Sequence, residues 1–212
     1  TKCGVWGILD VEYDYDKVGK TLTRHALSHR PWSHWRYEEL IPVDFSLHLP
    51  PLQIGFTPVY HTDRLSEWVG VHDLYLKDDG RNPSASFKDR ASSVGVMKAV
   101  EYHAKTIAAA STGNAASSLA CFAAAVGLPA FIFVPEKAPE PKIAQLLVFG
   151  ATVIKVKGTY DVVYDFCMEL STRHAVSDAT FKRTRELLSD QQIVDLIAVS
   201  GTYVTVAMLL NV

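Results

Sequence analysis

Residues 82–90, with the sequence NPSASFKDR, decide how the middle of the chain folds. From Phe87 onward, apolar side chains recur at intervals of three and four residues as far as Val100. This spacing predicts a helix over residues 86–103 with one buried face, and the serines just before it are suitable caps. Lys88 is therefore predicted to lie in the opening turn of a helix.

The position of Lys88 suggests a chemical role for its amine. The amino end of a helix is the positive end of the helix macrodipole, which disfavours the ammonium form of a lysine. A neutral amine is what a Schiff base with a carbonyl compound requires. The alternative is a surface lysine at a helix start, where the dipole opposes its charge. We favour the chemical role.

Residues 111–114, STGN, form the second informative stretch. They follow a predicted strand over residues 106–110 and open a predicted alanine-rich helix over residues 115–126. Free backbone N–H groups at such a strand-to-helix turn bind anions such as carboxylate or phosphate. A plain polar turn, with Asn114 as an ordinary N-cap, is the alternative interpretation.

The pattern around these stretches alternates strand and helix. Further strands are predicted over residues 73–77, 130–134 and 152–157, and a further helix over residues 141–149. Strands separated by helices of this length form βαβ units with a parallel sheet. The predicted fold class is therefore α/β, a parallel sheet with flanking helices followed by an α-helical tail. Open α/β sheets bind ligands at the carboxyl ends of their strands.

The two ends of the chain differ from this middle. Alternating apolar residues between residues 11 and 15 predict a strand near the start. From residue 159 the pattern is wholly helical, with one helix expected after a cap at Ser177 and an apolar one over residues 193–210. The apolar run approaches a membrane span in length, but its polar residues favour a buried or interface helix.

Composition excludes several functions. A net charge of −2, from 21 basic and 23 acidic side chains, would not recruit nucleic acid or a membrane surface. Three cysteines are too few for a disulfide framework, and Cys121 is expected to be buried. No signal peptide pattern is visible, so a cytoplasmic setting is expected. A metal site needs about four ligands, and Cys3 lacks partner cysteines, so no metal is predicted there. His25 and His29 on a helix could bind a metal, but a solvated face is the favoured interpretation.

The two motifs resemble those of threonine synthase, a pyridoxal-phosphate enzyme of the tryptophan-synthase-β superfamily. Supporting matches are GFTP at residues 55–58 and LYLKDD at residues 74–79, and the similarity covers residues 1–170. The resemblance implies part of the pyridoxal-phosphate fold of type II, with pyridoxal 5'-phosphate as cofactor. It also implies a small-molecule amino-acid substrate.

The resemblance assigns roles to individual residues. Lys88 would bind the cofactor as a Schiff base and transfer protons, and Asn114 would hydrogen-bond its 3'-oxygen. The substrate carboxylate would be received by three residues, which are Ser111, Thr112 and Gly113. The implied reaction converts O-phospho-L-homoserine and water to L-threonine and phosphate, and another lyase or dehydratase of this fold is an alternative.

Three other polar residues are not assigned to catalysis. Asp89 and Arg90 are predicted to make a structural ion pair or a helix-end contact. Lys142 is predicted to be solvated.

The resemblance also implies parts that are missing. Enzymes of this kind cradle the cofactor phosphate in a second glycine-rich loop, but no glycine-rich run follows Lys88. Charge-assisted contacts to phosphate are strong, so without them much of the cofactor's binding energy would be absent. A truncated or fused fragment without catalysis, with a helical tail for association, is therefore a competing interpretation.

The tail carries a second resemblance. Residues 176–196 and 206–211 are similar to the C-terminal helices of carboxymuconolactone decarboxylase-like proteins, which are all-helical and assemble as oligomers. This resemblance predicts a junction near residues 171–175 and includes a homo-oligomer among the expected states. The expected domains are an N-terminal segment at residues 1–70, an α/β domain at residues 71–170 and a helical tail at residues 171–212.

Overall fold

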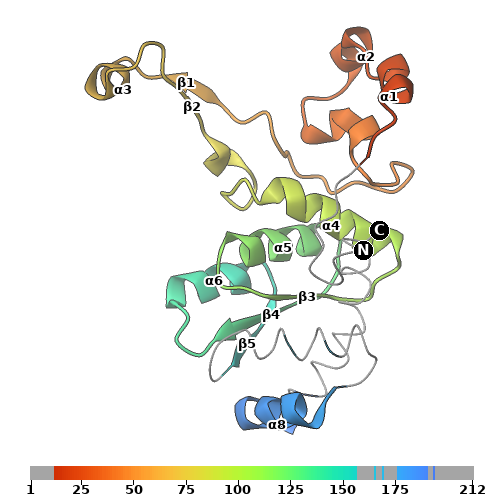
Figure 1. Cartoon of the computed structure of the whole chain (residues 1–212), viewed down its shortest axis with the longest axis vertical. Helices are drawn as coiled ribbons and strands as arrows, with labels where there is room; N and C mark the ends of the chain where they lie inside the picture. The colour runs from red at the N-terminus through yellow and green to blue at the C-terminus, as the bar shows by residue number, and fades with distance from the viewer. Residues whose placement is uncertain (1–11, 157–164, 166–168, 170–175, 191–192, 194–212) are drawn as a thin grey trace.

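A parallel sheet of three strands forms the centre of the computed structural model, which describes residues 12–156, 165, 169, 176–190 and 193 (Figure 1). The strands are β3 (Ile107–Ala110), β4 (Ala130–Pro135) and β5 (Thr152–Val156), in the order β3-β4-β5. In the register of the sheet, Ile107 lies opposite Ala130, and Phe131 lies opposite Thr152. The predicted α/β fold class is confirmed.

One face of this sheet is covered by three helices (Figure 1). They are α4 (Asp89–Glu101), α5 (Asn114–Ala125) and α6 (Glu140–Val148). Ile132 and Val134 of β4 pack on this side with Met97, Phe122 and Leu146, and all five are almost fully buried. The predicted helices are present with bounds shifted by a few residues.

The opposite face of the sheet has its own apolar cluster. Ala108, Phe133 and Ile154 point to this side and pack with Leu188 and Ile193. Alternate residues of each strand thus serve opposite faces, as the two-residue period of a strand requires. A parallel sheet that is covered on both faces explains why its strands are nearly continuous apolar runs.

The helix predicted after Ser177 is confirmed as α8 (Asp178–Leu187). The Ser177 hydroxyl accepts a hydrogen bond from the Thr180 N–H at 3.3 Å, which is the expected cap. The predicted helix over residues 193–210 lies outside the described residues apart from Ile193, as does the expected junction at residues 171–175. Among the described residues, no helix is both long enough and apolar enough to cross a membrane.

Residues 59–77 form an arm that projects from the rest of the molecule (Figure 1). The arm consists of β1 (Val59–His61), α3 (Asp63–Val69) and β2 (Tyr75–Lys77). The strand expected over residues 73–77 does not join the parallel sheet, which corrects the prediction. Instead it pairs antiparallel with β1, with Tyr60 opposite Leu76. The short return through α3 brings β1 close enough to act as its partner, and sequence analysis did not predict β1.

The N-terminal segment is helical, so the strand predicted near residues 11–15 is wrong where the structure describes it. Asp14 precedes α1 (Tyr15–Thr21), and its carboxylate accepts a hydrogen bond from the Lys17 N–H at 2.9 Å. This cap decides the conformation because it satisfies a free N–H group at the helix start. α1 is followed by α2 (Arg24–His29) and the 3-10 helix η2 (His34–Leu40).

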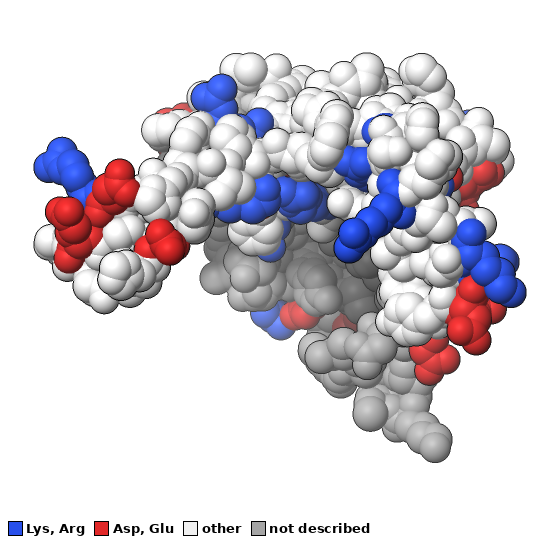
Figure 2. Space-filling view, turned by 90° about the horizontal axis from the view of Figure 1, so that it is seen from above, with Lys and Arg blue, Asp and Glu red and all other residues white. Residues whose placement is uncertain are grey.

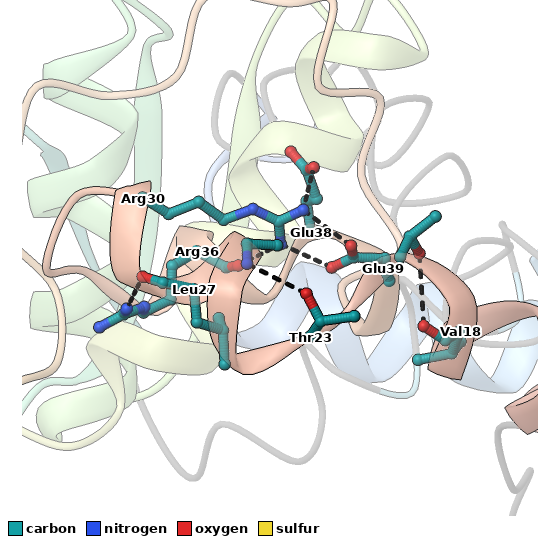
Figure 3. Close-up of polar contacts among 9 residues, drawn as sticks. Val18, Thr23, Leu27, Arg30, Arg36, Glu38 and Glu39 are labelled. Atoms are coloured by element: carbon teal, nitrogen blue, oxygen red, sulfur yellow. Dashed lines mark hydrogen bonds and ion pairs between the residues drawn. The ribbon is translucent and has the colours of Figure 1, made fainter.

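Arg30 holds this helical segment together (Figure 3). Its guanidinium lies 2.8 Å from Glu38 and 2.7 Å from Glu39, and it donates to the Arg36 carbonyl at 2.7 Å. The hydrogen bond from Arg30 lowers the pKa of Glu39 to about 2. Arg36 is buried, and its guanidinium stacks 4.4 Å from the centre of the Trp32 ring. A polar network therefore orders this segment, together with Trp35 of η2, which is buried in the apolar core.

Candidate active site

Lys88 occupies the N-cap position of α4, immediately before its first helical residue. This agrees with the predicted place at a helix start. The Lys88 side chain is exposed, and its Nζ lies 4.9 Å from the centre of the Phe87 ring, which is also exposed. An aldehyde in solution could therefore reach the amine.

The loop before Lys88 is closed by polar contacts. The Asp89 side chain is fully buried, and its carboxylate accepts hydrogen bonds from the Ser84 N–H at 2.7 Å and from the Ser84 hydroxyl. The Ser86 hydroxyl accepts from the Lys88 N–H at 3.1 Å. Ala85 has a φ of +60°, in the left-handed region that L-residues rarely occupy. Neither serine caps α4 with its side chain, which corrects the prediction: the Ser86 hydroxyl accepts from the Lys88 N–H just before the helix, and the Ser84 hydroxyl donates to Asp89.

Arg90 anchors the start of α4 to the segment at residues 55–58. Its guanidinium lies 3.0 Å from the Asp79 carboxylate, which also accepts a hydrogen bond from the Thr57 hydroxyl at 2.6 Å. The hydrogen bond from Arg90 lowers the pKa of Asp79, and that from Thr57 lowers it further. The contacts predicted for Asp89 and Arg90 are structural, as expected, but their partners are Ser84 and Asp79 rather than each other.

Asn82 completes the links between these segments. Its buried side chain accepts a hydrogen bond from the Gly55 N–H at 3.0 Å and donates one to the Asp79 carbonyl at 2.9 Å. Gly55 has a φ of +75°, and a Cβ there would lie 2.8 Å from the Arg90 guanidinium. The GFTP and NPSASFKDR stretches are therefore parts of one structure. Sequence reasoning noted both motifs but had no signal for the hydrogen bonds that join them.

The STGN stretch forms the predicted turn between β3 and α5. The Ser111 hydroxyl accepts a hydrogen bond from the Gly113 N–H at 3.3 Å, and Gly113 is the N-cap of α5. Among the described residues, no acceptor pairs with the backbone N–H groups of Thr112, Asn114 or Ala115. Three donors at the positive end of a helix are therefore available to an anion.

Asn114 is exposed, and its side chain has a basic neighbour. Its Oδ1 accepts a hydrogen bond from the Lys142 Nζ at 3.4 Å. Lys142 comes from α6, so a lysine that was predicted to be solvated brings a positive charge beside the turn. Sequence spacing could not reveal this neighbour, because 28 residues separate the two positions.

The two motifs belong to neighbouring helices. α4 packs against α5, and both helices begin on the same side of the molecule (Figure 1). Cys121 of α5 is buried, as predicted, and burial raises the pKa of its thiol to about 11. The negative charge of Asp89 contributes to this pKa shift, so the lysine loop and α5 are coupled electrostatically.

A hollow of about 360 Å³ lies on the arm, away from these motifs in the sequence. It is lined by His61, Asp63, His72 and Asp73 among other residues. The His61 ring lies 3.0 Å from the Asp63 carboxylate and 3.5 Å from that of Asp73. Within the described part of the chain, no group of three His, Cys, Asp or Glu residues is placed to hold a metal ion.

A family of proteins described as pyridoxal-phosphate dependent enzymes matches residues 51–207, which include Lys88 and the STGN turn. The chain belongs to this family. The cofactor predicted from the sequence, pyridoxal 5'-phosphate, is the one on which the family depends. The matched range continues past residue 171, and the predicted division into three domains stays a prediction.

Curated relatives within the pyridoxal-phosphate dependent family include several threonine synthases. That of Methanocaldococcus jannaschii is 37% identical over 170 residues, which are 80% of this chain and 42% of the relative. That of Methanosarcina acetivorans is 41% identical over 162 residues, or 76% of this chain and 38% of the relative. The chain therefore spans about two fifths of the length of these relatives.

Two solved structures are similar to part of this chain. Diaminopropionate ammonia lyase from Escherichia coli has a TM-score of 0.48 at 22% identity, covering 56% of this chain and 35% of that one. A pyridoxal 5'-phosphate-dependent aspartate racemase has a TM-score of 0.46 at 26% identity, covering 48% and 33%.

The described residues fit part of what pyridoxal phosphate requires. The exposed amine of Lys88 suits the aldehyde, and the open N–H donors of the STGN turn suit one anionic group. Both sites are open to solvent, since Lys88 and Asn114 are exposed while Ser111, Thr112 and Gly113 are half-buried. Each of the five predicted site residues is therefore at least partly accessible to solvent.

Proposed function

We propose that this chain carries the lysine-bearing part of a threonine synthase. The proposed enzyme is a pyridoxal-phosphate dependent lyase that converts O-phospho-L-homoserine and water to L-threonine and phosphate. The observation that carries the proposal is the hydrogen-bonded loop at residues 84–89, which presents Lys88 at the start of α4. The neighbouring helix α5 begins at the STGN turn, which we propose binds an anion. The similarity to threonine synthases over about three quarters of the chain supports this substrate class.

Each predicted residue then has a defined task. Lys88 binds the aldehyde carbon of the cofactor through Nζ, and the same atom takes up and returns protons. The Asn114 side chain would hydrogen-bond the 3'-oxygen of the cofactor. Bound pyridoxal phosphate supplies an electron sink for the reacting carbon.

The STGN turn holds the substrate carboxylate. The hydroxyl groups of Ser111 and Thr112 and the N–H groups around Gly113 donate to its oxygens. Lys142 lies beside Asn114, so its positive charge favours an anion at this turn. Basic side chains also gather where the arm joins the body (Figure 2), which favours a phosphorylated substrate on that side.

A capture experiment tests the role of Lys88 directly. The purified chain is incubated with pyridoxal phosphate, reduced with borohydride and digested, and the labelled lysines are located by mass spectrometry. We expect Lys88 to be labelled well ahead of Lys155, an exposed lysine on β5. Lys88→Ala should remove the dominant label, whereas Lys155→Ala should not. Equal labelling of the two lysines would contradict the proposal.

A product assay tests the substrate. Because the chain spans about two fifths of its relatives, the assay uses the longest gene product that contains it. We expect release of phosphate and threonine from O-phospho-L-homoserine in a Lys88-dependent manner. Turnover of serine or threonine instead would replace this proposal with a dehydratase of the same family.

A further inference from the structure

Asp89 follows Lys88 directly, yet the two side chains have opposite environments. Lys88 is exposed, whereas Asp89 is fully buried and bonded to Ser84. We propose that Asp89 is a positioning residue: its carboxylate closes the loop at residues 84–89 and so holds the Lys88 backbone where its amine meets the cofactor aldehyde. This inference rests on the proposed function of Lys88.

The contact between Asp89 and Ser84 is of a strong type. One carboxylate oxygen accepts the Ser84 N–H at 2.7 Å, and the other accepts the Ser84 hydroxyl. Hydrogen bonds to an ionised acceptor are roughly twice as strong as those between neutral groups. A buried carboxylate also requires such donors, because burying a charge without them is very unfavourable. The pair is therefore a stable link across the loop.

Other hydrogen bonds also close this loop, from the Asp89 N–H to the Ser86 carbonyl at 3.2 Å and from the Lys88 N–H to the Ser86 hydroxyl at 3.1 Å, but apolar packing adds little. The Phe87 side chain is 58% exposed, so apolar burial contributes little at the residue before Lys88. Ala85 has a φ of +60°, a backbone conformation that an L-residue disfavours unless its surroundings impose it. Without the Asp89 link, we expect Ala85 to relax and the orientation of Lys88 to vary.

The anchor on the other side of Lys88 is separate. Arg90 binds Asp79 at 3.0 Å and thereby ties the start of α4 to the segment around Thr57. Arg90 fixes where the helix lies, whereas Asp89 fixes the loop that enters it. Replacing Asp89 should therefore change the presentation of Lys88 while leaving the attachment of α4 in place.

The test compares Asp89→Asn and Ser84→Ala with Ser84→Thr, which keeps a hydroxyl, and with Asp63→Asn, an exposed carboxylate on the arm. The readout is the ratio of pyridoxal phosphate captured by borohydride at Lys88 to that captured at Lys155 in the same sample. We expect about a tenfold fall for Asp89→Asn, a smaller fall for Ser84→Ala and unchanged ratios for the two controls.

Hydrogen exchange supplies a readout that needs no cofactor. The amides of Ser84 and Lys88 should exchange faster in Asp89→Asn than in the parent chain, while those of β4 should not change. If Asp89→Asn does not fold, Ser84→Ala provides the same two measurements. Unchanged exchange and an unchanged capture ratio would overturn the positioning role.

The two proposals can fail separately. If the parent chain captures the cofactor selectively at Lys88 and Asp89→Asn does so equally, the positioning role is wrong and the proposed function stands. If the parent chain shows no selectivity at Lys88, the proposed function fails, and with it the positioning role that rests on it.

Discussion

The arm and the parallel sheet are both built from short strands, but they bury their residues very differently. Ile132 of β4 is 0% exposed, whereas Tyr75 of β2 is 59% exposed, and every residue of β1 and β2 is exposed. A two-stranded hairpin has marginal stability in water, while a parallel sheet with helices on its faces builds a core. The sheet and its helices therefore stabilise the fold, and the arm depends on them.

The lysine loop lies between these two regions in the chain. Residues 78–90 leave β2 and enter α4, and polar groups hold them rather than apolar packing. Figure 2 shows the arm projecting from the molecule, with both acidic and basic side chains near its end and further basic ones at its base. The lysine loop thus lies where the stable sheet region meets the exposed arm. Substitutions can therefore separate what each region contributes to the free energy of unfolding.

The largest effect is expected in the sheet. Ile132→Ala should lower the free energy of unfolding by about 3 kcal/mol, because it removes fully buried methyl groups and leaves a cavity. Leu76→Ala in β2 should change it by less than about 0.5 kcal/mol, because Leu76 is 44% exposed. Urea unfolding of both variants measures the difference. Equal losses would show that the arm has a core of its own.

A pH dependence of the free energy of unfolding should also arise outside the arm, at His34. His34 is buried against Ser93, and burial first, then the charge of Arg90, lowers its pKa to about 4 from 6.5. The folded state therefore binds the proton less well than the unfolded state. The contribution of neutral His34 to the free energy of unfolding is fully present above pH 6.5 and is lost as pH falls through 6.5 towards 4.

The size of the His34 effect can be checked by measuring the free energy of unfolding as a function of pH. The difference between the two pKa values corresponds to roughly 3 kcal/mol at most. We expect His34→Gln to flatten the decline of unfolding free energy over this pH window. His61→Gln, on the exposed arm, should leave the decline as it is, and a flattening there as well would contradict the assignment to His34.

Where residues 55–58 meet the lysine loop, the Asn82 side chain should contribute strongly to the free energy of unfolding. Asn82→Ala removes hydrogen bonds to the Gly55 N–H and the Asp79 carbonyl and leaves a buried N–H without a partner. We expect a loss of about 2 kcal/mol in unfolding free energy. Asn114→Ala, at an exposed position, should cost much less. Similar losses in the two variants would mean that the junction is not held by polar contacts.

The smallest effect distinguishes the loop from the helix that follows it. Ala85→Gly should raise the free energy of unfolding by about 0.5–1 kcal/mol, because glycine adopts a φ of +60° without strain. Ala91→Gly, inside α4, should lower it by about 1 kcal/mol. Thermal unfolding of the pair gives opposite signs if the left-handed conformation of Ala85 holds in solution.

Local patterns were sufficient for the parallel sheet and its helices. The strands β3 and β4 are apolar on both faces, and a glycine follows each of α5 and α6, so the sequence marks their positions. The same reasoning failed between residues 11 and 15, where the apolar alternation was real but Asp14 caps a helix. It also could not foresee that β2 would pair with β1, because strand pairing depends on which segments meet.

The amino-acid order alone determined the α/β class, the lysine at a helix start and the strand-to-helix turn at residues 111–114, since the elements themselves depend on local patterns. Only the tertiary structure decided the partners of Asp89 and Arg90, the approach of Lys142 to Asn114 and the exposure of the arm. Apolar spacing reports which side of an element avoids water. The partner of a polar side chain depends instead on which distant segments pack together, and no local pattern records that.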